Sequence, residues 1–242
     1  MIMNTIDFRL GVLSLPLIAV LFLSCSFDCE NGSGEIVSED RDIREINGVK
    51  LQIPADLLIE QGNTTSFRIE AQQNILSLIT TTVSQGVLTI SSQSCFGIHK
   101  PIRIRVSTPD IRKLSVSGSG AIRTENPVNT GKLELAVQGS GSIQIDANCE
   151  VLYSGIKGSG EMILSGTAHR QYVRIDGSGA YNAGQLASTS TEVEINGSGT
   201  AEVFPVEKLG VDIRGSAVVR YSGKPVVSSR IDGSGEVQKT SD

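Results

Sequence analysis

Hydrophobic and polar residues alternate with a period of two through most of the chain after residue 42, which is the pattern of half-buried β-strands. Turn signals such as Pro54 and Pro101 interrupt the alternation. The stretch 74–82 is apolar at both helical and strand spacing, and its threonines favour a strand because β-branched side chains suit a pleated surface. The alternation predicts strands at residues 49–53, 57–60, 67–71, 74–82, 87–91 and 102–107.

The second half of the chain repeats one tripeptide, Gly-Ser-Gly, at intervals of 18 to 21 residues. An apolar β-branched residue stands two positions before each copy, and a polar residue directly precedes it, so the alternation keeps one phase throughout. A fixed period near twenty residues is typical of a solenoid, whose coils stack and share one core. The copies begin at Gly118, Gly139, Gly158, Gly177, Gly197 and Gly233, with a variant Gly215-Ser216-Ala217.

Each tripeptide is interpreted as a corner at which a coil turns. Glycine suits such a corner because the inner side leaves little room for a Cβ and because glycine adopts the positive φ values of tight bends. By the parity of the alternation, both glycines are expected to face inwards and the serine outwards unless a bulge resets the register, while Ala217 leaves the tightness of its corner open. Seven stacked coils would span roughly 34 Å, with the N-terminal half as one cap. The expected corner residues are Gly118, Gly120, Gly139, Gly141, Gly158, Gly160, Gly177, Gly179, Gly197, Gly199, Gly215, Gly233 and Gly235.

Several blocks of sequence resemble one bacterial family, described as putative auto-transporter adhesin, head GIN domain. They are Ile46-Asn47-Gly48-Val49, the segments 59–62 and 86–90, and the run 104–111 that leads into 114–120. The resemblance covers about residues 42–240 and implies an all-β fold, a right-handed parallel β-helix with about 18–21 residues per coil, as a single domain with regular repeats over 107–240. It implies an adhesin-like role and brings no catalytic residue, cofactor or metal ligand.

The N-terminus predicts export. The apolar run 10–23 is too short for a membrane-spanning helix, which needs about 20 residues, and fits a secretory signal. The segment Phe22-Leu23-Ser24-Cys25 resembles a bacterial lipobox, which implies a signal peptide over residues 1–24 and lipidation of Cys25. An ordinary secretory signal with an incidental cysteine is the alternative. Residues 25–41 are predicted to be a flexible tether, and the expected location is the cell envelope, at the periplasmic or surface face of the outer membrane.

Three further cysteines, Cys29, Cys95 and Cys149, give no disulfide framework, because their number is odd and their spacing irregular. An exported chain can oxidise a pair. Cys95 and Cys149 are interpreted as buried small hydrophobic residues, with a bridge between them as the other possibility.

Composition and motifs exclude most other functions. The 242 residues carry a formal net charge of −5, which gives no basic stripe for nucleic acid. The third glycine of a dinucleotide-binding loop is missing from every copy of the repeat, and no phosphate-binding Gly-Lys-Ser/Thr occurs. Repeat-borne calcium would need an aspartate in each nonapeptide, whereas here only Asp176 and Asp232 directly precede a corner.

Catalysis finds little support either. Asp176 and Asp232 fall in one column of the solenoid, three coils or roughly 14 Å apart, which is too far for a pair of catalytic carboxylates. The column from Lys157 to Asp232 is interpreted as a solvated charge ladder, and His99 and His169 as solvated loop residues. Tyr153, Tyr172, Tyr181 and Tyr221 are interpreted as residues at the edge of the core.

The sequence therefore predicts a non-catalytic, exported lipoprotein that is adhesin-like or a scaffold. Its expected partners are the membrane, through Cys25, and an envelope or host protein or glycan. The alternative is a β-helix protein that binds or degrades polysaccharides. A groove in which carboxylates, or a carboxylate and a basic side chain, converge within roughly 10 Å would favour an enzyme.

Overall fold

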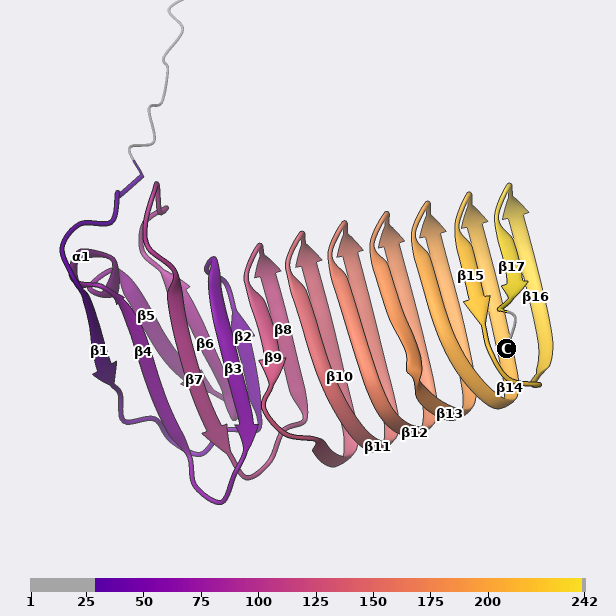
Figure 1. Cartoon of the computed structure of the whole chain (residues 1–242), viewed down its shortest axis with the longest axis horizontal. Coiled ribbons are helices and arrows are strands. Elements are labelled where there is room, and N and C mark those ends of the chain that lie inside the picture. The colour runs from indigo at the N-terminus through magenta and orange to yellow at the C-terminus, as the bar shows by residue number, and fades with distance from the viewer. Residues whose placement is uncertain (1–28, 241–242) are drawn as a thin grey trace, which may run out of the picture.

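A computed structural model describes residues 29–240, and the predicted signal peptide and Cys25 lie outside the described residues. The chain forms a solenoid with two faces (Figure 1). Each regular coil runs along one face to a Gly-Ser-Gly corner and returns along the other. We call the face that leads into the corners face A, and the face that follows them face B. No helix of residues 29–240 is long and apolar enough to cross a membrane.

The elements, in chain order, are β1 (Ile36–Asp40), β2 (Gly48–Leu51), β3 (Ala55–Gln61), β4 (Ser66–Gln72), α1 (Gln73–Leu76), β5 (Ile79–Ser84), β6 (Val87–Ser92), β7 (Ile102–Thr108), β8 (Lys113–Gly118), β9 (Ala121–Thr124), β10 (Val128–Gly139), β11 (Ser142–Gly158), β12 (Glu161–Gly177), β13 (Ala180–Gly197), β14 (Thr200–Gly215), β15 (Val218–Tyr221), β16 (Val226–Gly233) and β17 (Glu236–Lys239). From β7 onwards the chain passes alternately between the two faces, and the longest strands bend from face B into face A.

Strand pairing is parallel along the whole repeat region. Face A contains, in order, β5, β6, β2, β8, β10, β11, β12, β13, β14 and β16. Face B contains β1, β4, β7, β3, β9, β11, β12, β13, β14, β15 and β17. Among the described strands, antiparallel pairing is confined to β1–β4, β4–β7 and β5–β6 at the N-terminal end. The predicted parallel β-solenoid is confirmed.

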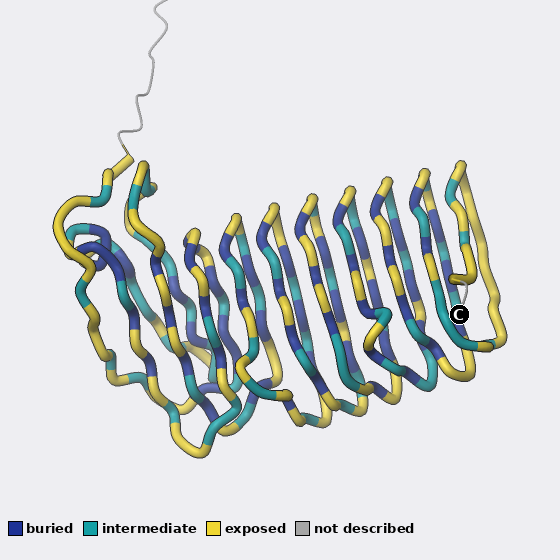
Figure 2. The backbone as a smooth tube through the Cα atoms, in the orientation of Figure 1, coloured by how far each residue is buried: buried dark blue, intermediate teal, exposed yellow. Residues whose placement is uncertain are grey.

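The register holds equivalent residues of successive coils side by side. Gly139 pairs with Gly118 and with Gly158, and the apolar residues two positions earlier form a continuous buried column. Figure 2 shows the resulting alternation of buried and exposed positions along every coil. A single coil could not bury such a row, so the stacking of coils supplies the core. The column contains Val116, Val137, Ile156, Ile175, Ile195 and Ile213, each at most 2% exposed.

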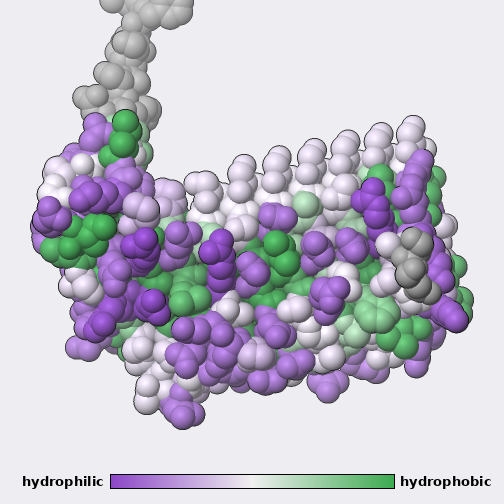
Figure 3. Space-filling view, viewed as in Figure 1, coloured by the Kyte–Doolittle hydropathy of each residue, from purple (hydrophilic) through white to green (hydrophobic). Residues whose placement is uncertain are grey.

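The two glycines of each corner have different roles, so the expectation that both face inwards is wrong. The first glycine lies at the exposed or half-exposed tip, with φ between +106° and +131°, a conformation that L-residues rarely adopt. The second has no positive φ, and from Gly120 to Gly199 it is buried. A Cβ at the second position would lie 2.3 to 2.8 Å from the nearest atom. Ala217 occupies this second position and is 1% exposed, so its corner keeps the common shape. The tips form a row of pale protrusions along one edge (Figure 3).

The N-terminal elements close one end of the solenoid. The stretch predicted as a strand at 74–82 is instead the short helix α1 followed by β5. Ile75 and Leu76 of this helix are 0% and 2% exposed, so the segment crosses the end of the core and plugs it with two apolar side chains. The helix connects β4 on face B with β5 on face A.

Part of the predicted tether at 25–41 belongs to the folded domain. Residues 36–40 form β1, which pairs with β4, and Arg68 donates to both carboxylate oxygens of Asp40 at 2.6 and 2.8 Å. Val37 packs against the core, and the Nδ2 atom of Asn74 donates to the backbone oxygen of Asn31 at 2.8 Å. Polar composition misled the prediction because β1 is an edge strand with one side towards solvent.

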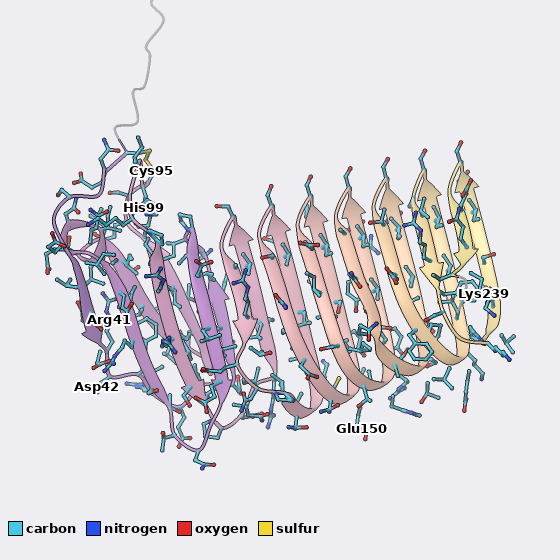
Figure 4. All side chains as sticks on the ribbon, in the orientation of Figure 1. Arg41, Asp42, Cys95, His99, Glu150 and Lys239 are labelled. Atoms are coloured by element: carbon cyan, nitrogen blue, oxygen red, sulfur yellow. A yellow bond between two sulfur atoms is a disulfide. The ribbon has the colours of Figure 1, made fainter. Side chains whose placement is uncertain are left out.

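The cysteines also differ from expectation. Cys29 and Cys95 form a disulfide, which Figure 4 shows beside the labelled Cys95 at the N-terminal end. Cys149 is not bonded to either and lies half-buried in β11. Burial, with a smaller effect of the Glu150 charge, raises the pKa of the Cys149 thiol to about 11. The sequence could not reveal the pairing, because 66 residues separate two cysteines that only the fold brings together.

A small polar cluster lies inside the core of the regular coils. Tyr181 is 2% exposed, and its hydroxyl accepts from Nε2 of Gln171 at 2.8 Å. Oε1 of Gln171 accepts in turn from the Thr191 hydroxyl at 2.9 Å. Desolvation raises the pKa of Tyr181 well above its ordinary value, despite hydrogen bonds from Ser154 and Gln171. Each of these buried polar groups therefore has a partner, as a stable core requires.

Candidate binding surface

A broad hollow lies on face A, across β8, β10 to β14 and β16, with a volume of about 1110 Å³. Its walls are the outward side chains that alternate with the core columns, so the period-two pattern that builds the core also builds this surface. We call it the tyrosine groove. Its principal side chains are Lys132, Glu134, Tyr153, Tyr172, Arg174, Glu194 and Arg214.

Two tyrosines of neighbouring coils stack at the centre of the groove. Tyr153 pairs in register with Tyr172, and their rings lie 5.0 Å apart at 12°. The Nζ atom of Lys132 lies 4.9 Å from the Tyr153 ring centroid, a cation–π distance. Tyr153 is nevertheless 42% exposed. The interpretation of these two residues as core edges is therefore wrong, whereas Tyr181 lies in the core and Tyr221 packs against it.

The floor beside the tyrosines is formed by small residues. Ala136 and Gly155 occupy successive coils of one outward column, and a Cβ at Gly155 would meet no atom within 4 Å. The next residue in this column is Arg174, whose long charged side chain also lines the groove. The groove therefore has aromatic and small residues side by side on β10 to β12, and charged residues from Arg174 onwards towards the C-terminal coils.

Charged side chains form a connected network in that part of the groove. Arg174 donates from Nη1 to Glu194 at 2.7 Å and from Nε to Asp176 at 2.9 Å. Arg214 reaches the other oxygen of Glu194 at 3.2 Å. Because the pairs are about half-exposed, they contribute little to stability, but they hold both guanidinium groups in fixed directions.

The predicted charge column lies at the edge of the groove. In register, Lys157, Asp176, Asn196, Arg214 and Asp232 stand on successive strands, so Asp176 and Asp232 are three strands apart and do not converge. Asn196 donates to Asp176 at 2.9 Å, which extends the charge network with an amide. These side chains are exposed or half-exposed, as the prediction of a solvated charge ladder expects.

The two histidines stand apart from the groove. Nδ1 of His99 lies 2.7 Å from the oxygen of Lys100, at the N-terminal end that Figure 4 labels, and Nδ1 of His169 lies 3.1 Å from the Thr189 hydroxyl. Neither histidine lines the groove. Residues 29–240 also contain no group of three or more His, Cys, Asp or Glu side chains that could hold a metal ion.

Carboxylates and basic groups do converge in the groove, which is the arrangement that would favour an enzyme. A glycosidase needs one carboxyl with a raised pKa as general acid. Hydrogen bonding from Lys132 lowers the pKa of Glu134, and hydrogen bonds from Arg174 and Asn196 lower that of Asp176. Both carboxyls are therefore held ionised, which suits binding and not proton donation.

Comparisons with known proteins agree on the fold. The family model described as putative auto-transporter adhesin, head GIN domain, matches residues 45–225. A putative adhesin from Bacteroides fragilis superposes with a TM-score of 0.81 at 24% identity, over 87% of this chain and 100% of that one. One from Parabacteroides merdae gives 0.74 at 18% identity, over 88% and 100%. A structure from Parabacteroides distasonis described as a putative lipid binding protein gives 0.75 at 22% identity, over 88% and 99%. No curated protein matches the chain.

Proposed function

We propose that this chain, which belongs to the family of putative auto-transporter adhesins with a head GIN domain, is an exported, lipid-anchored module that binds a partner at the cell envelope without catalysing a reaction. The tyrosine groove carries the proposal as the binding surface. The partner is an envelope or host protein or glycan.

The groove supports binding because it offers several kinds of contact in fixed positions. The tyrosine edges and the small-residue floor present apolar area, while Arg174 and Arg214 present directed hydrogen-bond donors. Aromatic and arginine side chains dominate binding energies at protein surfaces because they combine area with few rotatable bonds or with several donors. The stacked coils hold all of them on a rigid sheet.

Export is supported by the disulfide between Cys29 and Cys95 as well as by the lipobox-like sequence. Disulfides persist in oxidising compartments and are rare in the cytosol, where thiols are kept reduced. Cys29 lies four residues after Cys25 in the sequence and is tied to the domain by the disulfide. Lipidation at Cys25 would therefore hold the N-terminal end of the solenoid close to the membrane, with the long axis free to carry the groove away.

Anchoring is tested by the substitution Cys25→Ser in the full chain. We expect the wild-type protein in the membrane fraction and the variant in the soluble exported fraction, because the acylated thiol is lost. Metabolic labelling with a fatty-acid analogue should mark the wild-type chain and not the variant, and Cys149→Ser serves as the matched control. Continued membrane retention and labelling of the Cys25→Ser chain would contradict the anchor.

Binding is tested by the double substitution Tyr172→Ala and Arg174→Ala. Glycan arrays and proximity labelling on intact cells should first identify a partner. The variant should bind this partner at least about tenfold more weakly, because the aromatic ring of Tyr172 and the guanidinium group of Arg174 are both lost from the groove. The matched control carries Asn182→Ala and Arg220→Ala on face B, with exposed side chains outside the groove. Equal loss in the two variants would argue against the groove, and turnover of an arrayed glycan would argue against a non-catalytic role.

A further inference from the structure

The two ends of the solenoid are built differently. The last coil, β16 and β17, pairs only with β14 and β15 among the described strands. Ile231 and Val227 occupy core columns but are 41% and 37% exposed, whereas Ile213 and Leu209, their partners one coil earlier, are 0% and 1% exposed. This end therefore presents unpaired backbone groups on both faces and a cross-section of the core, a combination that promotes strand pairing with another chain.

The N-terminal end is built differently, although β1 and β5 are also edge strands, each paired on one side only among the described strands. Helix α1 plugs its core with Ile75 and Leu76. The edge strand β1 carries Glu39 and Asp40, so antiparallel pairing of β1 about Glu39 with a second copy would place like charges opposite one another. The two acidic residues of β1 thus oppose pairing of this strand with its own copy. At the C-terminal end, β16 carries one charge of each sign, Arg230 and Asp232.

A second copy fits the C-terminal edge through a two-fold axis. Such an axis pairs β16 with its own copy in antiparallel fashion, and directly opposite residues must share a face, so that core residues meet core residues. If the axis passes through Ile231, that residue meets its own copy in the core. Arg230 then lies opposite Asp232 of the other copy, and the pair occurs twice. The overlap runs from Ser229 to Gly233.

The same axis suits face B. Ile231 on face A lies two residues before the Gly-Ser-Gly corner, and Val237 on face B lies two residues after it, so the two residues are equally far from the tip. A two-fold axis that passes through Ile231 therefore also passes through Val237. Val237, which packs against the core, would meet its own copy, and Glu236 would face Gln238, a donor for its carboxylate.

Neighbouring registers are excluded by charge. An axis through Arg230 would place two copies of that guanidinium side by side. An axis through Ser229 would pass through Lys239 on face B, which follows the inward phase of Val237, and two lysines would meet. Like charges directly opposite on adjacent strands are destabilising.

We propose that the C-terminal coil is a homodimerisation edge, at which two copies join tail to tail about a two-fold axis through Ile231 and Val237. The dimer continues both faces from one copy into the other, buries the exposed core residues and leaves the two N-terminal ends pointing apart. It also presents two tyrosine grooves, which would raise avidity for a repetitive partner.

Cross-linking tests the register in the full chain, extracted in mild detergent and carrying Cys149→Ser. Under mild oxidation, Ile231→Cys should give disulfide-linked dimers, because residues on the axis have Cα atoms about 4.5–5.5 Å apart. The matched control Ser229→Cys has the same inward phase but lies roughly 14 Å from its copy by the rise per residue, and it should not cross-link. Equal cross-linking at both positions, or cross-linking at residue 229 alone, would overturn the proposal.

Charge exchange tests the interface independently. Arg230→Asp and Asp232→Arg should each weaken self-association by roughly tenfold or more, because both cross-strand pairs become repulsive. A mixture of the two variants should associate like wild type, since each pair again joins opposite charges. Analytical ultracentrifugation over a dilution series measures this, and thermal melting of each variant checks its fold. A monomeric wild type, assemblies larger than dimers, or no recovery in the mixture would overturn the proposal.

Discussion

Replacing Gly158 by valine is expected to lower the free energy of unfolding by roughly 3 kcal/mol. Gly158 is the first residue of its corner, with φ +113°, and a Cβ there would lie 2.8 Å from the backbone oxygen of Gly139. A β-branched residue is disfavoured at positive φ, and the contact atom is backbone, so it cannot move aside without shifting the next coil. For a domain of this size the melting temperature should fall by roughly 6–12 °C.

The matched control lies three residues earlier in the same strand. Gly155 has no positive φ, and a Cβ there meets nothing within 4 Å, so Gly155→Val should leave the melting temperature unchanged or raise it slightly. Differential scanning calorimetry of both variants checks the pair. If Gly158→Val melted with the wild type, or if the two variants were equally destabilised, the first glycine would not be the conformational requirement of the corner.

The contrast between these glycines explains how much of the fold the sequence could predict. The solenoid was predictable because every coil repeats the same signals: an apolar residue such as Ile156, then a polar one, then Gly-Ser-Gly. The different roles of Gly158 and Gly160 were not predictable. Counting alternate positions as inward and outward assumes an extended chain, and Gly158, with φ +113°, is not extended. Ala217 was the available clue, since it marks the position where a small Cβ is tolerated.

The N-terminal elements and the groove were less predictable for a different reason. α1 covers the end of the core between β4 and β5 with Ile75 and Leu76, a tertiary packing role that overrides the strand preference of its neighbours. Tyr153 and Tyr172 are 19 residues apart, and only the register of β11 on β12 shows that they stack. Aligning the outward positions of the repeats, as well as the corners, would have placed these two tyrosines in one column.

Removing the disulfide between Cys29 and Cys95 is expected to destabilise the domain strongly. The double substitution Cys29→Ser and Cys95→Ser is expected to cost roughly 2–4 kcal/mol, because the bond closes a loop of 66 residues and loop-closure entropy sets an upper bound of about 4 kcal/mol. The bond holds residues 29–32 against the segment around residue 98, where the backbone N–H of Gly32 donates to the oxygen of Ile98 at 2.8 Å. Without it this segment and β1 should fray first, since edge elements open most easily.

Thermal melting and limited proteolysis check this expectation together. The double variant should melt roughly 5–10 °C lower and be cleaved near residues 29–40 faster than wild type, and a reducing agent should reproduce both effects in the wild-type chain. Cys149→Ser is the matched control, because its thiol is outside the disulfide and half-buried in β11, so its melting temperature should stay at the wild-type value and remain sensitive to reduction. An unchanged melting temperature in the double variant would mean that β1 and its hydrogen bonds, including those of Arg68 to Asp40, hold this end without the covalent bond. Lowered stability in the Cys149→Ser chain would instead indicate that packing of that side chain, and not the bridge, limits stability.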